Sequence, residues 1–422
     1  MPKVFFQLGH SPDLSHAEIV SVNQLHGGPL QERQRVDDAF LEGACDSLEA
    51  VQPLMPELGG AIRLGEWLAE GETIGQADEG AETLAQRILS LPVCDEWQGQ
   101  SGKLVVGVSM VETGKALGGR RKAYGFAHDL GDALKHQLTE TGRSVRMVLP
   151  GSDKATFVLN GAQVEKNRLL KRGGELVLHV DGQGGVRAGL TRQLQPFEAY
   201  SKRDYGRPQR DPRSGMLPPK LARMLINLAR QPQTHTLLDP FCGSGSLLME
   251  AALLGLQPVG CDSSKKAIED TRANNEWLQN QFPEVRAIRA VEGDAGELRK
   301  HVEPLFFDCC VTEPDLGPPQ SRPVSPEKIG PLLKRLSALY LRALGEIRTV
   351  VRPGARVVFL MPRFVVEGKN QPAVFRLLPD LRLQGYTLLD PLQGFAPTAK
   401  RATLVYARPK QVVQREVFVL QA

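Results

Sequence analysis

The sequence predicts an α/β protein whose C-terminal half folds as an open, mostly parallel β-sheet. Three short segments in this half are predicted to be strands that end in an aspartate, at Asp239, Asp262 and Asp294. A fourth apolar segment, residues 309–311, leads through Thr312 into Glu313. Open α/β sheets bind their ligands at the carboxyl ends of the strands, so these acids are expected to share one site.

Residues 1–100 are expected to form a small α+β unit. The run Ser15-His16-Ala17-Glu18 matches a capping box, in which two side chains satisfy backbone N–H groups at a helix start. The expected elements, in order, are a strand at 4–8, a helix at 15–25, a strand near 39–41 and a helix at 81–91.

Residues 101–192 are expected to form a second α+β unit. Leu130, Leu134 and Leu138 recur at four-residue spacing and predict its longest helix. The expected elements, in order, are a strand at 103–111, a helix at 124–139, strands at 144–149 and 155–159, a helix at 160–170, and strands at 175–180 and 186–190.

The net charge of +4 conceals an uneven distribution along the chain. Residues 1–100 carry 5 Lys and Arg against 17 Asp and Glu, whereas residues 101–230 carry 23 against 11. Such a basic segment is the expected footprint of a nucleic-acid-binding surface, with an ordinary solvated surface as the alternative. Lys166, Arg168 and Lys171, close together on one expected helix, are the candidate phosphate contacts.

Residues 193–213 are predicted to be a basic linker, because the stretch 200–213 is rich in Arg, Pro and Tyr and poor in aliphatic residues. Arg203 and Arg207 are expected to contact phosphates there. The segment that follows opens a helix with prolines in its first turn, where proline costs no hydrogen bond.

The turn after the first aspartate-ending strand is suited to a ligand. Gly243 and Gly245 permit a tight turn and let a ligand approach bare backbone, although a purely structural turn is the alternative. A dinucleotide fingerprint would need a third glycine where Leu248 stands. An aspartate at the strand end instead suits an ammonium group, such as that of S-adenosylmethionine (SAM). Asp262 is then placed to accept ribose hydroxyls, and Asp294 to meet the adenine amine.

The residues after the fourth strand are candidates for catalysis. A nucleobase amine is a poor nucleophile because its lone pair is delocalised into the ring. Acceptors aimed at its N–H groups favour the nucleophilic form and the charge that develops on it. The Glu313 carboxylate and the Pro314 carbonyl are the candidate acceptors, and the proline ring stiffens the loop. An alternative is that Cys309 or Cys310 acts as the nucleophile for methylation at a pyrimidine carbon. We favour two side chains of a buried strand, because the Glu313-Pro314 loop follows directly.

Residues 214–422 resemble the class I methyltransferase domain of RNA methyltransferases that carry a THUMP domain, with the tRNA guanine-N2 methyltransferase branch as the nearest in pattern. The resemblance implies a Rossmann-like sheet that ends in an antiparallel strand pair. It also implies SAM as cofactor and RNA, above all tRNA, as partner. In the same comparison residues 101–192 resemble a THUMP RNA-binding domain and residues 1–100 a ferredoxin-like lead-in. The resemblance of residues 214–422 rests on the motifs GMLPPKLA (215–222), DPFCGSGSLLMEAALLG (239–255), VGCD (259–262), EGDA (292–295) and TEPDLGPP (312–319).

The resemblance also implies which residues form the site, with Glu313 and Pro314 as catalytic residues. The family carries an aromatic residue shortly after the proline, whereas this chain has Asp315 and then a leucine. Phe364, expected in the loop after a strand that ends near Met361, is the candidate ring to stack on the target base instead. The residues expected to bind the cofactor are Met216, Leu217, Asp239, Phe241, Gly243, Gly245, Asp262, Asp294 and Ala295.

The C-terminal part is expected to contain a helix at 327–350, a strand at 356–361 and an antiparallel pair at 402–407 and 412–420. No segment is long and apolar enough to span a membrane, and the N-terminus shows no signal-peptide pattern. The six cysteines show no CxxC pairing and the histidines are scattered. The expected setting is therefore cytoplasmic and reducing, without a metal site.

The function predicted from these residues is SAM-dependent methylation of the exocyclic N2 amine of guanosine in tRNA. Two alternatives stay open. An adenine-amine or rRNA guanine methyltransferase would use the same site. An RNA- and SAM-binding protein that has lost catalysis would account for the missing aromatic at position 315.

Overall fold

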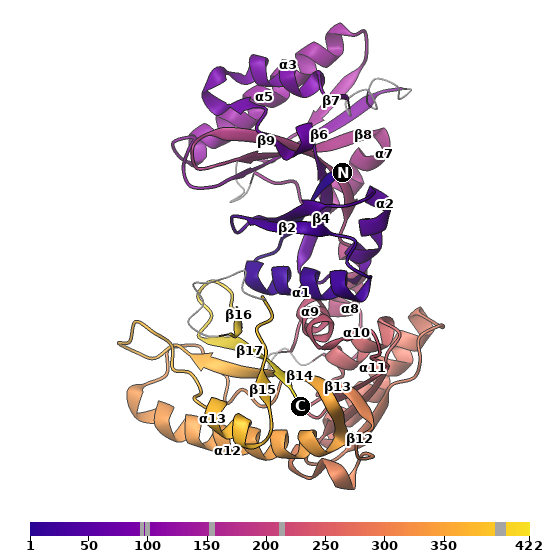
Figure 1. Cartoon of the computed structure of the whole chain (residues 1–422), viewed down its shortest axis with the longest axis vertical. Coiled ribbons are helices and arrows are strands. Elements are labelled where there is room, and N and C mark those ends of the chain that lie inside the picture. The colour runs from indigo at the N-terminus through magenta and orange to yellow at the C-terminus, as the bar shows by residue number, and fades with distance from the viewer. Residues whose placement is uncertain (93–96, 98–101, 152–156, 211–215, 393–401) are drawn as a thin grey trace. The chain divides into compact units, whose positions relative to one another are not determined.

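The structure is a computed structural model (Figure 1) that describes residues 1–92, 97, 102–151, 157–210, 216–392 and 402–422. It divides into two compact units. The first comprises Met1–Gly9, Gly28–Pro56 and Ala61–Phe197, and the second comprises His10–Gly27, Glu57–Gly60 and Glu198–Ala422. The domain boundaries expected at residues 100, 192 and 213 stay predictions. Within the described ranges, none of the helices is both long and apolar enough to cross a membrane.

A nine-stranded sheet forms the first unit, in the order β2-β3-β1-β4-β9-β8-β6-β7, with β5 paired to β9. The two α+β parts expected from the sequence share this sheet, because β4 pairs antiparallel with β9. The strands are β1 (Lys3–Leu8), β2 (Gln31–Val36), β3 (Phe40–Ala44), β4 (Ala61–Trp67), β5 (Gly75–Gln76), β6 (Leu104–Glu112), β7 (Val145–Val148), β8 (Gly173–Val180) and β9 (Gly185–Leu194).

Two helices of the first unit, α3 (Ala81–Leu89) and α5 (Arg120–Glu140), pack against each other and share one apolar cluster with the sheet. The three leucines at four-residue spacing in α5 are all buried in that cluster, as their spacing predicts. A third helix, α2 (Leu48–Val51), is a single turn.

Two elements of the first unit differ from expectation. The helix expected at 160–170 is two short helices, α6 (Gly161–Lys166) and α7 (Leu169–Arg172). They are separate because Arg168 adopts a left-handed φ of 53°, which interrupts a helix. The strand expected at 155–159 falls partly outside the described residues, and residues 157–159 are not part of a strand.

An eight-stranded sheet forms the second unit, in the order β12-β11-β10-β13-β14-β17-β15, with β16 paired to β17. The strands from β12 to β14 are parallel and β17 runs antiparallel to β14. This is the predicted open α/β sheet with an antiparallel C-terminal end. The strands are β10 (Thr236–Asp239), β11 (Gln257–Asp262), β12 (Arg289–Glu292), β13 (Phe307–Thr312), β14 (Val351–Phe364), β15 (Thr387–Leu388), β16 (Leu404–Tyr406) and β17 (Val413–Gln421).

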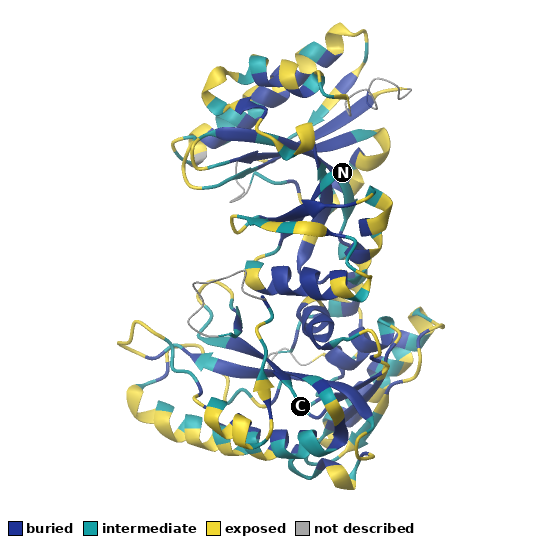
Figure 2. Ribbon diagram, in the orientation of Figure 1, coloured by how far each residue is buried: buried dark blue, intermediate teal, exposed yellow. Residues whose placement is uncertain are grey.

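Helices cover both faces of this sheet, so its central strands β10 and β13 are buried along their whole length (Figure 2). One apolar cluster joins the sheet to helices α9, α10 and α11, and another joins it to α12 and α13. Cys309 belongs to the first cluster and Cys310 to the second, because successive side chains of a strand point to opposite faces of the sheet. The helices are α9 (Pro219–Ala229), α10 (Ser246–Leu253), α11 (Lys265–Gln281), α12 (Pro326–Val350) and α13 (Leu378–Leu383).

Helix α1 (Pro12–Leu25) belongs to the second unit although it lies early in the sequence. It begins three residues before the expected start, and Glu18 does not close a capping box. Instead the buried Glu18 carboxylate accepts hydrogen bonds from the Gly59 N–H at 2.8 Å, the Gly60 N–H at 2.7 Å and the Asn227 side chain of α9 at 2.8 Å. These bonds attach α1 and the segment Glu57–Gly60 to α9.

Candidate active site

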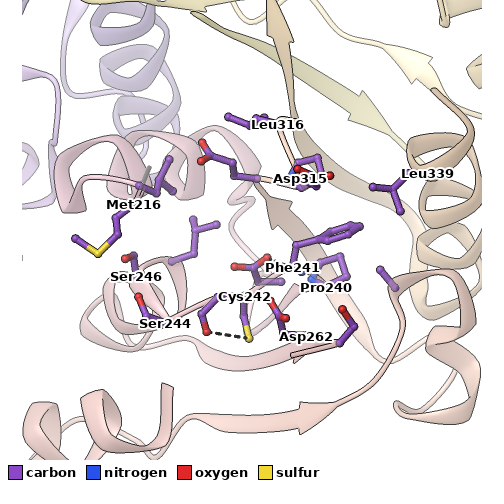
Figure 3. A pocket seen from close by; sticks show the side chains of 18 of the residues that line it. Met216, Pro240, Phe241, Cys242, Ser244, Ser246, Asp262, Asp315, Leu316 and Leu339 are labelled. Carbon is purple, nitrogen blue, oxygen red and sulfur yellow. Dashed lines mark hydrogen bonds between the residues drawn. The ribbon is translucent and has the colours of Figure 1, made fainter. Parts of the chain in front are cut away.

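A cavity of about 620 Å³ lies where β10, β11 and β13 end, in the second unit (Figure 3). Most of the residues expected to bind the cofactor or to act in catalysis line it, including Asp239, Asp262 and Glu313. Asp315 and Leu316, which stand where the family carries its aromatic residue, line it as well. The full lining is Met216, Leu217, Asp239, Pro240, Phe241, Cys242, Gly243, Ser244, Ser246, Leu247, Asp262, Ser263, Asp294, Ala295, Glu313, Pro314, Asp315, Leu316, Gly317 and Leu339.

Asp239 is the most deeply buried acid of the cavity, with 1% of its surface exposed. Its Oδ1 accepts hydrogen bonds from the Thr312 hydroxyl at 2.7 Å and from the Phe241 N–H at 3.2 Å. Burial raises the pKa of Asp239 to about 7, although both hydrogen bonds act in the opposite direction. A carboxyl group in this environment gains strongly from a cation placed beside it.

The turn that follows β10 is held open by two glycines with positive φ, Gly243 at 52° and Gly245 at 84°. The Gly243 N–H donates to Asp262 Oδ2 at 2.9 Å, which connects the turn to the end of β11. A Cβ added at Gly243 would meet no protein atom within 4 Å, so the cavity reaches the backbone there. Gly245 does not line the cavity, and a Cβ added there would meet the Thr271 side chain of α11 at 3.0 Å.

Two further acids mark the ends of the neighbouring strands. Asp262 Oδ1 accepts from the Ser264 N–H at 2.9 Å. Asp294 accepts from the Gly296 N–H at 2.7 Å and pairs with Arg342 of α12 at 3.0 Å. Both carboxylates line the cavity, as their positions at consecutive strand ends predict.

Glu313 follows directly after β13, and its carboxylate forms a side-on ion pair with Arg415 of β17. Arg415 Nη2 donates to Oε1 at 3.0 Å, while Nε donates to Oε2. The two side chains are 14% and 9% exposed. The partners are 102 residues apart, and no local pattern in the sequence indicated Arg415.

Asp315 lines the cavity but is held by helix α12. Its Oδ2 pairs with Arg335 at 3.1 Å, its Oδ1 accepts from the Gly317 N–H, and its carbonyl accepts from the Tyr340 hydroxyl at 2.7 Å. The expectation that Phe364 lies in a loop and stacks on a base is wrong. Phe364 is the last residue of β14 and is fully buried, because it pairs with Val413 and packs in the core under Gly317.

The expected linker arginines are also placed differently from the prediction. Helix α8 (Phe197–Tyr205) occupies part of the linker, and Arg203 is buried against Glu250 of α10, which also pairs with Arg223. Arg207 is 2% exposed and donates to the Ser246 hydroxyl. Phosphate contacts by Arg203 and Arg207 are therefore excluded in this conformation, because their guanidinium groups are occupied inside the second unit.

The three basic residues expected to bind RNA lie in the first unit and are exposed. Arg168 and Lys171 line one cavity of about 450 Å³, together with Arg192 of β9. Lys166 is not part of that lining. Their role in RNA binding stays a prediction.

The buried cysteines do not favour chemistry at a pyrimidine carbon. Cys309 and Cys310 have no exposed surface, and burial raises the pKa of both thiols far above the ordinary value. A nucleophilic thiol needs access and a lowered pKa, so both serve as core residues.

Known proteins resemble this chain in sequence and in fold. A family model described as "RMKL-like, methyltransferase domain" matches residues 207–301. A tRNA (guanine(10)-N2)-dimethyltransferase of Methanothermobacter thermautotrophicus is 30% identical over 180 residues, which is 42% of this chain. The matched part spans only 48% of that relative, about half its length.

Two solved structures extend the similarity over the whole chain. TrmN from Thermus thermophilus has a TM-score of 0.58 at 17% identity and covers 100% of this chain and 99% of its own. A putative methyltransferase complexed with SAH has a TM-score of 0.51 at 13% identity and covers 99% of this chain and 97% of its own. At these identities the likeness concerns the fold. The sheet of the second unit is accordingly a class I methyltransferase fold, with residues 207–301 similar to the RMKL-like methyltransferase domain.

Proposed function

We propose that this protein is a SAM-dependent RNA methyltransferase that acts on the exocyclic N2 amine of guanosine in tRNA. The observation that carries the proposal is that Glu313 and Pro314 line the same cavity as Asp239 and Asp262. An acceptor pair for an amine thus lies beside a site suited to a cationic nucleoside. The matched guanine-N2 relative supports the choice of amine and of tRNA.

The residues present fit the cofactor. The cavity lies within the size range of small-molecule sites, and it reaches bare backbone at Gly243. Asp239 would hold the ammonium group, Asp262 the ribose hydroxyls, and Asp294 with Ala295 the adenine. Met216, Leu217 and Phe241 line the same cavity and would complete the pocket. When bound, SAM supplies an electrophilic methyl group on a sulfonium.

Glu313 and Pro314 act on the target amine in this proposal. The Glu313 carboxylate and the Pro314 carbonyl accept the amine N–H groups, which localises the nitrogen lone pair and stabilises the positive charge that develops on the nitrogen. The rigid proline loop keeps both acceptors in place while base and cofactor are held close together.

RNA recognition is assigned to the first unit. We propose residues 101–192 as a THUMP RNA-binding domain and residues 1–100 as a ferredoxin-like domain, with Lys166, Arg168 and Lys171 as phosphate contacts. The excess of basic residues in 101–230 supports this assignment.

The test is methyl transfer to RNA from a strain that lacks this protein. Purified protein with methyl-labelled SAM should label the tRNA fraction, and nucleoside mass spectrometry should find N2-methylated or N2,N2-dimethylated guanosine. Glu313→Ala should abolish labelling and retain SAM binding in calorimetry. Labelling of rRNA alone, or of adenosine, would reject the proposed substrate. SAM binding without labelling of any RNA would favour a protein that has lost catalysis.

A further inference from the structure

We infer that Arg415 is a positioning residue, which holds the Glu313 carboxylate in the orientation that receives the target amine. The inference rests on the proposed function, in which Glu313 accepts an N–H of the nucleobase. Arg415 lies outside the matched segment 207–301 and makes its contacts within the second unit.

The geometry of the pair fixes the plane of the carboxylate. Arg415 donates through Nε to one oxygen of Glu313 and through Nη2 to the other, at 3.0 Å for the second bond. A side-on guanidinium constrains both oxygens at once, which a lysine ammonium does not. A carboxylate has about four acceptor positions, so two remain for an incoming amine.

The surroundings of Arg415 favour its charged form and fix its backbone. Burial lowers the pKa of Arg415, but the adjacent Glu313 carboxylate more than offsets this, so the net direction is upward. The Arg415 backbone lies between Pro362 of β14 and Tyr406 of β16 in the sheet. A side chain whose backbone is paired with a strand on each side is a precise support for a catalytic group.

The ion pair also lies where two cavities meet. Glu313 lines the cofactor cavity, while Arg415 lines an adjoining cavity of about 360 Å³. Leu316 and Gly317 line both. The ion pair therefore lies at the junction of the cofactor cavity and a second cavity that could admit the base, and Gln411 offers a polar contact in the second cavity.

The experiment compares Arg415→Gln, Arg415→Lys and the exposed-site control Arg408→Gln in steady-state methylation of unmodified tRNA. We expect Arg415→Gln to lower kcat about 100-fold, as for other small misplacements of a catalytic group, with SAM affinity retained and the melting temperature lowered, because the buried Glu313 carboxylate loses its partner. Arg415→Lys should recover only a small part, and Arg408→Gln should match the wild type. Added guanidinium should partly restore Arg415→Gln, which loss of a merely structural residue would not allow.

A double-mutant cycle separates this inference from the proposed function. If Arg415 acts through Glu313, Arg415→Gln should have no further effect on kcat in a Glu313→Gln background. Additive losses, or full kcat in Arg415→Gln, would overturn the inference while the loss in Glu313→Gln still supports the proposed function. Full kcat in Glu313→Gln, or no transfer by the wild type, would instead reject the proposed function itself.

Discussion

Asp239 is a residue whose protonation state should control cofactor binding. Its carboxyl is buried at the end of β10, and burial raises its pKa to about 7. A protonated carboxyl cannot pair with an ammonium group, so binding of SAM at low pH must release a proton. The same group with an ordinary pKa would show no such dependence near neutral pH.

We therefore expect SAM affinity to rise as pH increases from about 6 to 8 and to level off above the pKa of Asp239. Calorimetry in two buffers of different ionisation enthalpy should detect the released proton below pH 7. Asp239→Asn should bind SAM at least about tenfold more weakly and lose this pH dependence, since it removes a charge-assisted contact. A pH-independent affinity in the wild type would contradict the assigned role of Asp239.

Glu18 shows how elements distant in sequence are held together in the second unit. The carboxylate on α1 satisfies two backbone N–H groups of the segment Glu57–Gly60 and the Asn227 amide on α9. Burial raises the pKa of Glu18 to about 7, with the three hydrogen bonds opposing the shift. Arg203, Glu250 and Arg223 connect α8, α10 and α9 in the same way.

The raised pKa of Glu18 predicts a specific pH dependence of stability. The folded state holds a proton that the unfolded state releases near pH 4.5, so stability should fall as pH rises from about 4.5 to 7. The loss attributable to Glu18 should approach about 3 kcal/mol. Urea unfolding at pH 5 and pH 8 measures it, and Glu18→Gln should show a smaller difference between the two. Equal pH differences in wild type and variant would contradict the buried titration.

At the scale of the whole molecule, charge is divided along the chain rather than spread evenly. The acidic residues concentrate in 1–100 and the basic residues in 101–230. Several basic residues of 101–230 are not on the surface, since Arg203, Arg207 and Arg223 are buried in the second unit. The net excess therefore overstates the charge available for the proposed binding of RNA, and the exposed residues Lys166, Arg168 and Lys171 remain the candidate contacts.

We expect joint charge reversal of Lys166, Arg168 and Lys171 to weaken tRNA binding and to reduce its salt dependence by about one unit of slope per lost phosphate contact. Filter binding at several salt concentrations measures both quantities. Joint reversal of the exposed Lys135, Lys300 and Lys369 changes the net charge equally and is the matched control. Equal weakening by both triple variants would assign the effect to net charge and reject a defined site.

The succession of strands along the chain and the positions of the acids could be predicted from the sequence. Asp239, Asp262, Asp294 and Glu313 each end or follow a predicted strand, and consecutive parallel strands place such ends on one edge of a sheet. The acids that line the candidate site were therefore predictable, because each of them carries a local signal.

Only the tertiary structure decided the remaining features. Arg415 lies opposite Glu313 because β17 inserts beside β14, and Phe364 is buried because β14 continues beyond Met361. The sequence predicts Arg203 as a linker residue, whereas in the structure it forms a buried ion pair with Glu250. It likewise predicts α1 as part of the N-terminal unit, whereas the helix belongs to the second unit. These contacts join residues far apart in the chain, so they depend on packing and ion pairing that no short stretch of sequence specifies.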